Sequence, residues 1–215
     1  IGTTFYAGTW RDLAPVEHGI YVNGQGWLTI GGAHTGGSGP QSINNGNYIA
    51  FHNSATRAGI FVNDGAPSIR GNFIGTNRAG ADLGNVYGIH LSAGTDGVAI
   101  GSSAYGNGNV IGWSDSYQIN MNSSTASAKT IQGNFIGTTY DAGVWRDLAA
   151  ADNGIYVNMT GTSLTIGGLS TGGAGTQNIN QGNYIAYHNT PGMSGIVIVN
   201  GSPTIRGNYI GTNRD

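Results

Sequence analysis

Two copies of a Trp-Arg-Asp tripeptide carry the side chains in this chain best suited to chemistry, Trp10-Arg11-Asp12 and Trp145-Arg146-Asp147. Tyr6 and Tyr140 stand close to them in the sequence. An aromatic ring beside a planar guanidinium and a carboxylate can stack on a sugar face while the charged groups hydrogen-bond its hydroxyls. Alternatively, each Trp folds back over apolar surface and the charged pair makes local or lateral contacts. The tripeptides are therefore predicted sites of carbohydrate contact or of lateral contact.

Catalysis is not expected from the other polar residues. A glycoside hydrolase needs two carboxylates about 5 to 10 Å apart on one surface, and a calcium-dependent lyase needs a cluster of acids. The acidic residues here are scattered singly over the chain, and the five His residues show no metal-ligand spacing. We therefore predict no catalytic residues, no metal site and no cofactor.

The elements that must position the tripeptides are set by a short repeated motif, Gly-Asn-X-Ile, in which X is aromatic in all copies but one. Its Gly residues are 25, 37, 25, 49 and 25 residues apart, so short and long steps alternate. A motif at such spacings is typical of a repeat architecture. The Asn residues of the six copies are Asn47, Asn72, Asn109, Asn134, Asn183 and Asn208.

Two further sets of apolar residues recur once for every copy of this motif. A strand-like segment opens with Ile20, Ile60, Ile89, Ile119, Ile155 and Ile196, and a second Ile lies between that segment and the motif, at Ile30, Ile69, Ile100, Ile131, Ile166 and Ile205. Each repeat therefore has three short β-like segments. One such repeat cannot bury enough apolar surface to offset its ordering entropy, so it must stack on copies of itself.

Stacked repeats of this kind form a parallel β-helix, in which equivalent segments pair as parallel strands about 4.8 Å apart. The Ile columns then make a continuous core. An Asn at the same bend of every turn can hydrogen-bond to the Asn above and below, which keeps a buried polar ladder satisfied. We predict an all-β, right-handed parallel β-helix of about six three-stranded coils, with the six Asn residues as a structural ladder.

The composition agrees with a solenoid. The chain has 215 residues with 40 Gly, and 8% of its residues are charged, far below the roughly 25% of an average globular protein. The formal net charge of −2 and the absence of a basic cluster argue against nucleic-acid binding. Cys is absent, and no apolar run is long enough to span a membrane.

A larger duplication lies above the single coil. Residues 1–73 and 136–209 are near copies, and residues 74–135 supply the intervening coils. The long excursions of residues 1–14 and 136–149, which contain the tripeptides, correspond in the two copies. We therefore treat residues 1–215 as one β-helix array. Neither end resembles a capping unit, which predicts a segment of a longer array or a subunit that stacks end to end.

Two outward rows could also carry function. If the Ile of each Gly-Asn-X-Ile motif points inward, the preceding aromatic residues point outward as a column, either exposed to a linear polysaccharide or covered by loops or a neighbour, and we favour cover or packing. A near-column of Thr and Ser precedes the middle Ile, but a single interrupted rank makes ice binding a minor alternative.

The chain resembles right-handed parallel β-helix repeat proteins, which are often bacterial secreted or surface proteins with a pectin-lyase-like scaffold. The resemblance lies in the alternation of coils with Thr-Ile-Gly-Gly and Gly-Asn-Tyr-Ile-Ala and coils with Thr-Ile-Arg-Gly-Asn and Ile-Gly-Thr-Asn-Arg. That scaffold carries several functions, so function is not fixed by the resemblance. We expect a non-enzymatic rod, located outside the cell or on its surface, that forms part of a fibre, filament or adhesin shaft by self-association. The alternative is a domain that binds or degrades polysaccharide.

Overall fold

The structure is a computed structural model, and it describes most of the chain. The described residues are 1–6, 9–12, 17–24, 26–33, 45–54, 56–104, 106–125, 127–141, 143–149, 153–160, 163–169, 181–188 and 190–212, with the side chains of residues 4–6 and 9–11 outside the description. All regular elements in this part of the chain are β-strands.

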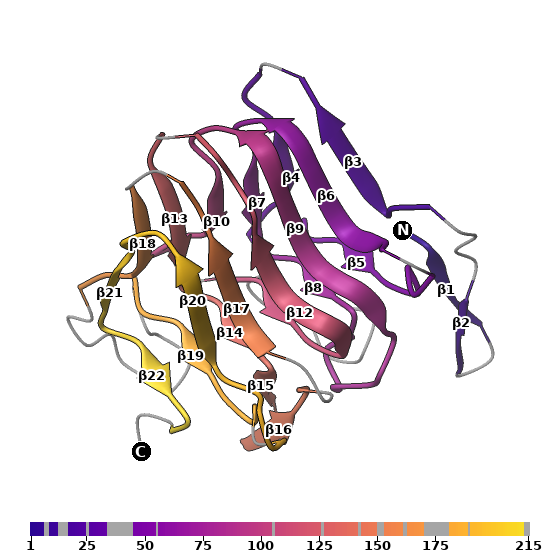
Figure 1. Cartoon of the computed structure of the whole chain (residues 1–215). Coiled ribbons are helices and arrows are strands. Elements are labelled where there is room, and N and C mark those ends of the chain that lie inside the picture. Colours follow the sequence, from indigo (N-terminus) through magenta and orange to yellow (C-terminus); the bar gives the residue numbers. More distant parts are fainter. Residues whose placement is uncertain are drawn as a thin grey trace.

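Three parallel sheets of six strands each run the length of the molecule (Figure 1). The first sheet contains β3 (Ile20–Asn23), β6 (Ala58–Gly65), β9 (Asn85–Thr95), β12 (Ser114–Met121), β17 (Asn153–Asn158) and β20 (Ile196–Asn200). The second contains β4 (Thr29–Gly31), β7 (Ser68–Arg70), β10 (Ala99–Gly101), β13 (Lys129–Gln132), β18 (Leu164–Gly167) and β21 (Thr204–Arg206). The third contains β5 (Tyr48–Ile49), β8 (Phe73–Ile74), β11 (Val110–Ile111), β14 (Phe135–Ile136), β19 (Tyr184–Ile185) and β22 (Tyr209–Ile210).

One strand from each sheet makes one coil, so the chain winds through six coils, numbered 1 to 6 from β3–β5 to β20–β22. The strands pair in register, Ile on Ile, as in Ile60↔Ile89 of the first sheet and Ile69↔Ile100 of the second. The inward Ile, Val, Leu and Met side chains form one buried core cluster. This arrangement confirms the predicted all-β parallel β-helix of about six coils.

An Asn ladder runs beside this core, at the bend before the third sheet. Asn109 Nδ2 donates to Asn134 Oδ1 at 2.9 Å, and Asn134 Nδ2 donates to Asn183 Oδ1 at 3.0 Å. The same side chains also bond to backbone, since Asn109 Nδ2 donates to Ile69 O at 2.9 Å. The amide groups are thereby paired although most of them are buried. The ladder comprises Asn47, Asn72, Asn109, Asn134, Asn183 and Asn208.

Gly71 shows why the residue before the ladder Asn is Gly. Its φ is +65°, and a Cβ there would lie 1.7 Å from Gly32 O of the neighbouring coil. Only Gly combines that backbone conformation with so close an approach of two chains.

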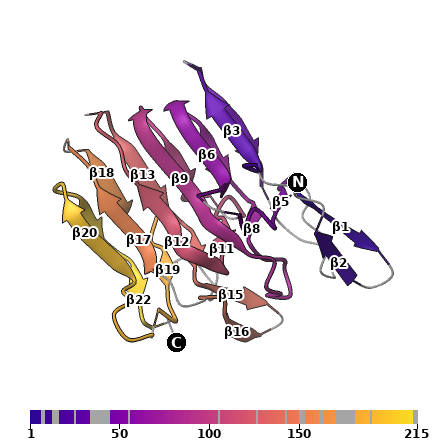
Figure 2. The ribbon, with the colours of Figure 1, turned by 45° about the vertical axis from the view of Figure 1, so that its right-hand side comes forward.

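The two long excursions are antiparallel hairpins, a detail that the repeat pattern did not predict. They are β1 (Thr3–Tyr6) with β2 (Thr9–Asp12), and β15 (Thr138–Asp141) with β16 (Val144–Asp147). Their registers are equivalent, with Thr3↔Asp12 in one and Thr138↔Asp147 in the other. Figure 2 shows both hairpins leaving the stack on the same side, several coils apart.

Candidate functional site

The outward aromatic column of the third sheet is covered rather than open. Tyr48, Phe73 and Tyr184 are buried, and Tyr48, Phe73 and Val110 form an apolar cluster of their own with Leu148. Burial raises the pKa of the Tyr48 phenol to about 12. This column therefore stabilises the fold and presents no open strip to a polysaccharide.

The hairpin β15–β16 provides part of this cover through Trp145. The indole ring lies edge-on to Tyr184, with centroids 4.6 Å apart, and 5.1 Å from Tyr140 on the opposite strand. Its Nε1 is buried without a hydrogen-bond partner among the described residues. Trp145 is thus packed over the aromatic column, and its remaining exposed face borders a pocket.

The charged members of the second tripeptide point to different places. Arg146 packs its aliphatic stem against Gly80, where an added Cβ would lie 2.9 Å from Arg146 Cδ. Asp147 is exposed, and its Oδ1 accepts a hydrogen bond from Ala149 N at 2.9 Å. The three side chains of Trp145-Arg146-Asp147 do not converge on one ligand position.

The first tripeptide stands at the other end of the stack. Asp12 ends β2 and is exposed, and the backbone of Trp10 pairs with that of Phe5. The side chains of Tyr6, Trp10 and Arg11 lie outside the described part of the structure. The equivalent hairpin registers place the two tripeptides at corresponding positions of the repeat.

A second row of rings, which sequence reasoning missed, lies on the outer face of the first sheet. Phe61 stacks on Tyr21 with centroids 5.5 Å apart and planes within 3°, and Tyr117 stacks on Tyr156 at 4.6 Å. The signal was present in the sequence, because Tyr21, Phe61 and Tyr156 each directly follow the first Ile of their coil. We call these residues the outer row, which comprises His18, Tyr21, Phe61, Tyr87, His90, Tyr117 and Tyr156.

The outer row encloses polar atoms that lack partners. His90 Nδ1 and Asn120 Oδ1, which lie in register on β9 and β12, are buried without hydrogen bonds to the described residues. Burial, with a smaller contribution from the charge of His18, lowers the pKa of His90 to about 4. The outer row is therefore apolar and uncharged at neutral pH around these two polar atoms.

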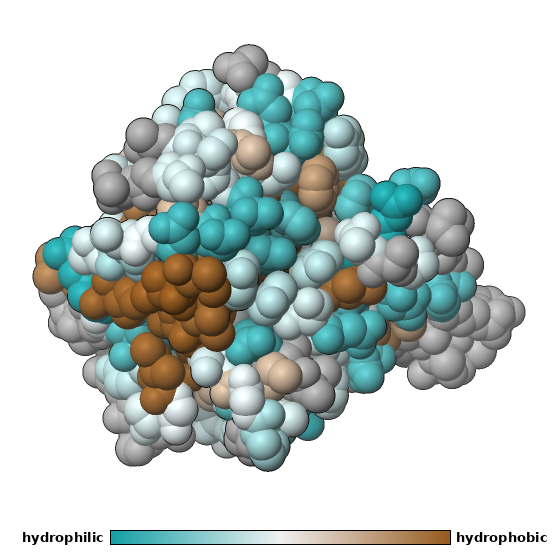
Figure 3. All heavy atoms as spheres, viewed as in Figure 1, coloured by the Kyte–Doolittle hydropathy of each residue, from teal (hydrophilic) through white to brown (hydrophobic). Residues whose placement is uncertain are grey.

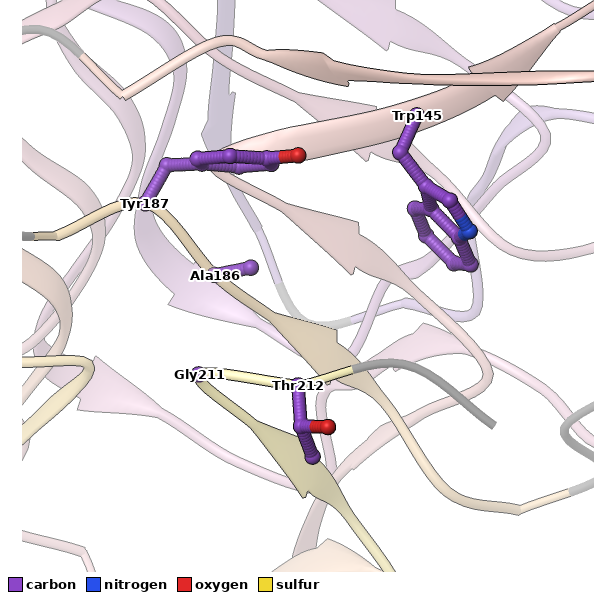
Figure 4. A pocket seen from close by; sticks show the side chains of 5 residues that line it. All are labelled: Trp145, Ala186, Tyr187, Gly211 and Thr212. Atoms are coloured by element: carbon purple, nitrogen blue, oxygen red, sulfur yellow. The ribbon is translucent and has the colours of Figure 1, made fainter. Parts of the chain in front are cut away.

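A pocket of about 250 Å³ lies at the third sheet near coil 6. It is lined by Trp145, Ala186, Tyr187, Gly211 and Thr212. Figure 4 shows the Trp145 and Tyr187 rings on either side, with Ala186 between them and the Gly211–Thr212 backbone below. Its lining combines two aromatic rings with three small residues.

Lys129 is a buried cation whose ammonium group donates hydrogen bonds to nearby oxygen atoms. Lys129 Nζ donates to Thr125 Oγ1 at 2.8 Å and to Ser127 O at 3.2 Å. Burial lowers the pKa of this amine, and the carboxylate of Asp96 acts in the opposite direction. The lysine closes the corner between the first and second sheets in coil 4.

The described residues include no group of three or more His, Asp or Glu side chains placed to hold a metal ion. Within the same part of the chain, no helix is long and apolar enough to cross a membrane.

Comparisons of the chain with protein-family models, with curated proteins and with solved structures gave no match. The functional proposals below therefore rest on the chain's own geometry and on the pattern of its repeats.

Proposed function

We propose that this chain is a non-enzymatic structural rod that lengthens by adding further β-helix coils to its ends. One observation carries the proposal: the last coil presents apolar side chains to solvent. Ile198 is 45% exposed, Val199 63%, Ile205 39% and Ile210 48%. Figure 3 shows the resulting apolar patch at the β20 edge of the molecule.

The patch coincides with unpaired strand edges. β20, β21 and β22 are the outermost strands of their sheets on this side, and β3, β4 and β5 are the outermost on the other. An open strand edge beside apolar side chains is a template for another strand. A second copy can continue the first and second sheets directly, because coil 1 and coil 5 have nearly the same sequence and coil 5 already follows an even-numbered coil. At the third sheet Ile1 already pairs with the β5 edge, since Ile1 N donates to Tyr48 O at 2.7 Å and Ala50 N donates to Ile1 O at 3.2 Å.

The proposal includes a location outside the cell or on its surface. Support for the location comes from the resemblance of the repeats to right-handed parallel β-helix proteins of the bacterial secreted and surface type. In such a place the rod would form part of a fibre, filament or adhesin shaft, with coil number setting length and the excursions setting lateral contacts.

Electron microscopy of the purified chain over a concentration series tests this proposal. We expect rods longer than six coils to appear as concentration rises, with an axial repeat of about 4.8 Å per coil. Val199→Lys, which puts a charge on the β20 edge, should keep the particles short. Leu169→Lys is the matched control, because Leu169 is equally exposed, at 63%, but is not on the coil 6 edge. Monodisperse six-coil particles at every concentration would refute the proposal.

The outer row favours a second candidate function, the binding of a neutral polysaccharide along the axis. Its rings recur in successive coils, and Tyr21 is 56% exposed. Sugar rings stack on such aromatic faces.

Affinity electrophoresis in gels containing neutral polysaccharides tests this candidate. Retardation that is lost in Tyr21→Ala and Tyr156→Ala supports it. Trp27→Ala is the control, because Trp27 is 92% exposed and belongs to no ring contact of the outer row. Equal mobility with and without polysaccharide would exclude this candidate for the glycans tested.

A further inference from the structure

A histidine just before β3 holds the backbone of coil 2. Ala58 N donates to His18 Nδ1 at 3.0 Å, and Ala58 O accepts from Gly19 N at 3.1 Å. Both backbone polar groups of Ala58 are thus bonded to two successive residues of the preceding coil. We call this pair of hydrogen bonds the His18 link.

The second copy of the duplication contains the same link with a different side chain. Ser194 N donates to Asn153 Oδ1 at 2.8 Å, and Ser194 O accepts from Gly154 N at 3.0 Å. In the duplicated sequence Asn153 and Ser194 occupy the positions of His18 and Ala58. We call this pair the Asn153 link. The molecule therefore holds one link with a titratable acceptor and one with an acceptor that does not titrate.

The direction of the hydrogen bond fixes the protonation state of His18. A backbone N–H can only donate, so Nδ1 must be the unprotonated nitrogen of a neutral ring. A charged imidazolium carries a proton on both nitrogens and cannot accept. Protonation of His18 therefore breaks its bond to Ala58 N, whereas the amide oxygen of Asn153 accepts at any pH at which the chain is folded.

Charged neighbours of His18 come from both coils. Arg57 Nη1 lies 3.5 Å from His18 Nε2 and 3.4 Å from Glu17 Oε2, and His52 Nδ1 donates to Glu17 O at 2.8 Å. Burial, followed by the positive charge of Arg57, lowers the pKa of His18, while Glu17 acts in the opposite direction. These surroundings agree with the neutral ring that the hydrogen bond requires.

The His18 ring also covers part of the outer row. It stacks on Phe61 with centroids 4.5 Å apart, and His90 of coil 3 contacts Phe61 edge-on at 5.0 Å. Tyr21 lies 6.0 Å from His18, and Tyr87 lies 5.1 Å from His90. A charged imidazolium is attracted to an aromatic face, but that attraction does not restore the acceptor that Ala58 N needs.

We propose that the His18 link is an acid-sensitive catch between coils 1 and 2, which is closed while His18 is neutral and opens when His18 is protonated. The Asn153 link between coils 5 and 6 stays closed through the same change. Opening leaves Ala58 N without its acceptor and loosens the His18 ring from Phe61, while the inward Ile core is untouched. The inference concerns contacts within one chain, so it stands apart from both end-to-end growth and polysaccharide binding.

The pH range follows from the direction of the pKa shift. The pKa of His18 in the folded chain lies below the ordinary value of about 6.5, because the neutral ring is the one that makes the link. The stability that the link provides is therefore fully present above about pH 6.5 and is lost as pH falls below it. His90 has a pKa of about 4, so it remains largely neutral over the first part of this fall.

NMR spectroscopy of the nitrogen-15-labelled chain between about pH 8 and about pH 4 tests the proposal. At neutral pH the His18 Nδ1 signal should be that of an unprotonated nitrogen. The Ala58 amide signal should then shift with the same midpoint as the His18 ring, below the ordinary 6.5. The Ser194 amide should show no such shift. A protonated Nδ1 at neutral pH would overturn the proposal, because that nitrogen could not accept from Ala58 N.

Two exchanges of the acceptor supply matched variants. His18→Asn gives coil 1 the acceptor of coil 5, and the Ala58 amide should then no longer shift with pH. Asn153→His should transfer the pH-dependent shift to the Ser194 amide. Each variant is informative without the other. An Ala58 amide that still titrates in His18→Asn would assign the response to His52 or His90, which that variant retains, and would overturn the proposal.

Hydrogen exchange gives a second readout that does not depend on chemical shifts. After correction for the pH dependence of exchange in an unprotected peptide, protection of the Ala58 amide should fall about fivefold relative to Ser194 between neutral pH and about pH 4, as expected for one lost hydrogen bond. In His18→Asn the ratio of the two protections should stay constant. A constant ratio in the wild-type chain would contradict an opening link.

Discussion

Coil 2 and coil 6 have almost the same sequence but very different surroundings. Residues 67–76 and 203–212 differ only by Ser68 against Thr204 and Phe73 against Tyr209. Ile69 is fully buried, whereas its counterpart Ile205 is 39% exposed. The difference comes from the neighbour that coil 2 has on both sides and coil 6 has on one. Burial in this molecule is therefore a property of stacking rather than of the repeat itself, as expected for a solenoid.

Truncation of the middle Ile should show the largest contrast between the two coils. Ile69→Ala removes methyl groups from a closed core and should lower the free energy of unfolding by about 2–5 kcal/mol. Ile205→Ala at the open edge should cost about 1 kcal/mol, because the side chain is already partly hydrated. Chemical denaturation of the two variants at low protein concentration measures the difference. Equal losses would mean that coil 6 is covered in solution.

The Asn ladder should give the next largest contrast. Asn109 is fully buried and bonds to Asn72, Asn134 and Ile69 O, so Asn109→Ala leaves several buried groups unpaired and should cost about 3 kcal/mol. Asn208 lies in the outermost described coil and bonds to an Asn on one side only, so Asn208→Ala should cost about 1 kcal/mol. Thermal unfolding followed by circular dichroism compares them, and a more costly Asn208 variant would contradict the ladder account.

The pH dependence of the free energy of unfolding should also differ between an interior coil and the end coil, by less than the Asn ladder variants do. The pKa of His90 in coil 3 is about 4, below the ordinary 6.5, so its neutral form is the one that packs. Stability from this group is fully present above pH 6.5 and is lost as pH falls from 6.5 towards 4, by about 2 kcal/mol after allowance for partial exposure.

His90→Phe should remove that part of the acid sensitivity. In coil 6 the same position is Val197, which does not titrate. Urea unfolding at pH 7 and pH 4.5 for wild type and variant provides the check. An unchanged pH dependence in His90→Phe would place the acid sensitivity elsewhere.

The smallest expected effect compares the two hairpins. Arg78 Nε donates to Asp141 Oδ1 at 3.2 Å, which joins the loop that follows β8 to β15. In the first hairpin the position of Asp141 is occupied by Tyr6. Asp141→Asn should cost about 0.5–1 kcal/mol, since both partners are partly exposed. Limited proteolysis of the β15–β16 turn should quicken in this variant, and cleavage at the wild-type rate would show that packing of Trp145 alone holds the hairpin.

The sequence predicts the scaffold well because the same residue types recur at corresponding positions in every coil. Every coil has its own Ile, Asn and Gly at corresponding positions, so the strand number, the parallel pairing and the six coils follow from spacing and burial. The Asn ladder could be inferred in the same way, since a polar residue repeated at one bend needs a partner in the next coil.

The candidate site was harder to predict because its residues come from excursions that differ in length. Asp82-Leu83 follows a short loop and Asp147-Leu148 a long hairpin, so spacing alone does not show that Leu83 O and Leu148 O accept from the backbone N–H groups of the equivalent residues Phe51 and Trp113. The positive φ of Phe51, Trp113 and Tyr187 leaves no mark on residue type, as all three are bulky. The outer row was not predicted, because its rings come from two different positions, Tyr21, Phe61 and Tyr156 after the first Ile and Tyr87 and Tyr117 two residues before it.

Hydrogen exchange of the coil 6 amides as a function of protein concentration is the most direct test of the claim that stacking creates burial. At low concentration the amides of β20, β21 and β22 should exchange much faster than those of β7, β10 and β13. We predict that their protection rises with concentration while that of coils 2 to 5 stays constant, because an added copy turns coil 6 into an interior coil. Coil 6 amides that exchange at the same rate at every concentration would contradict the account.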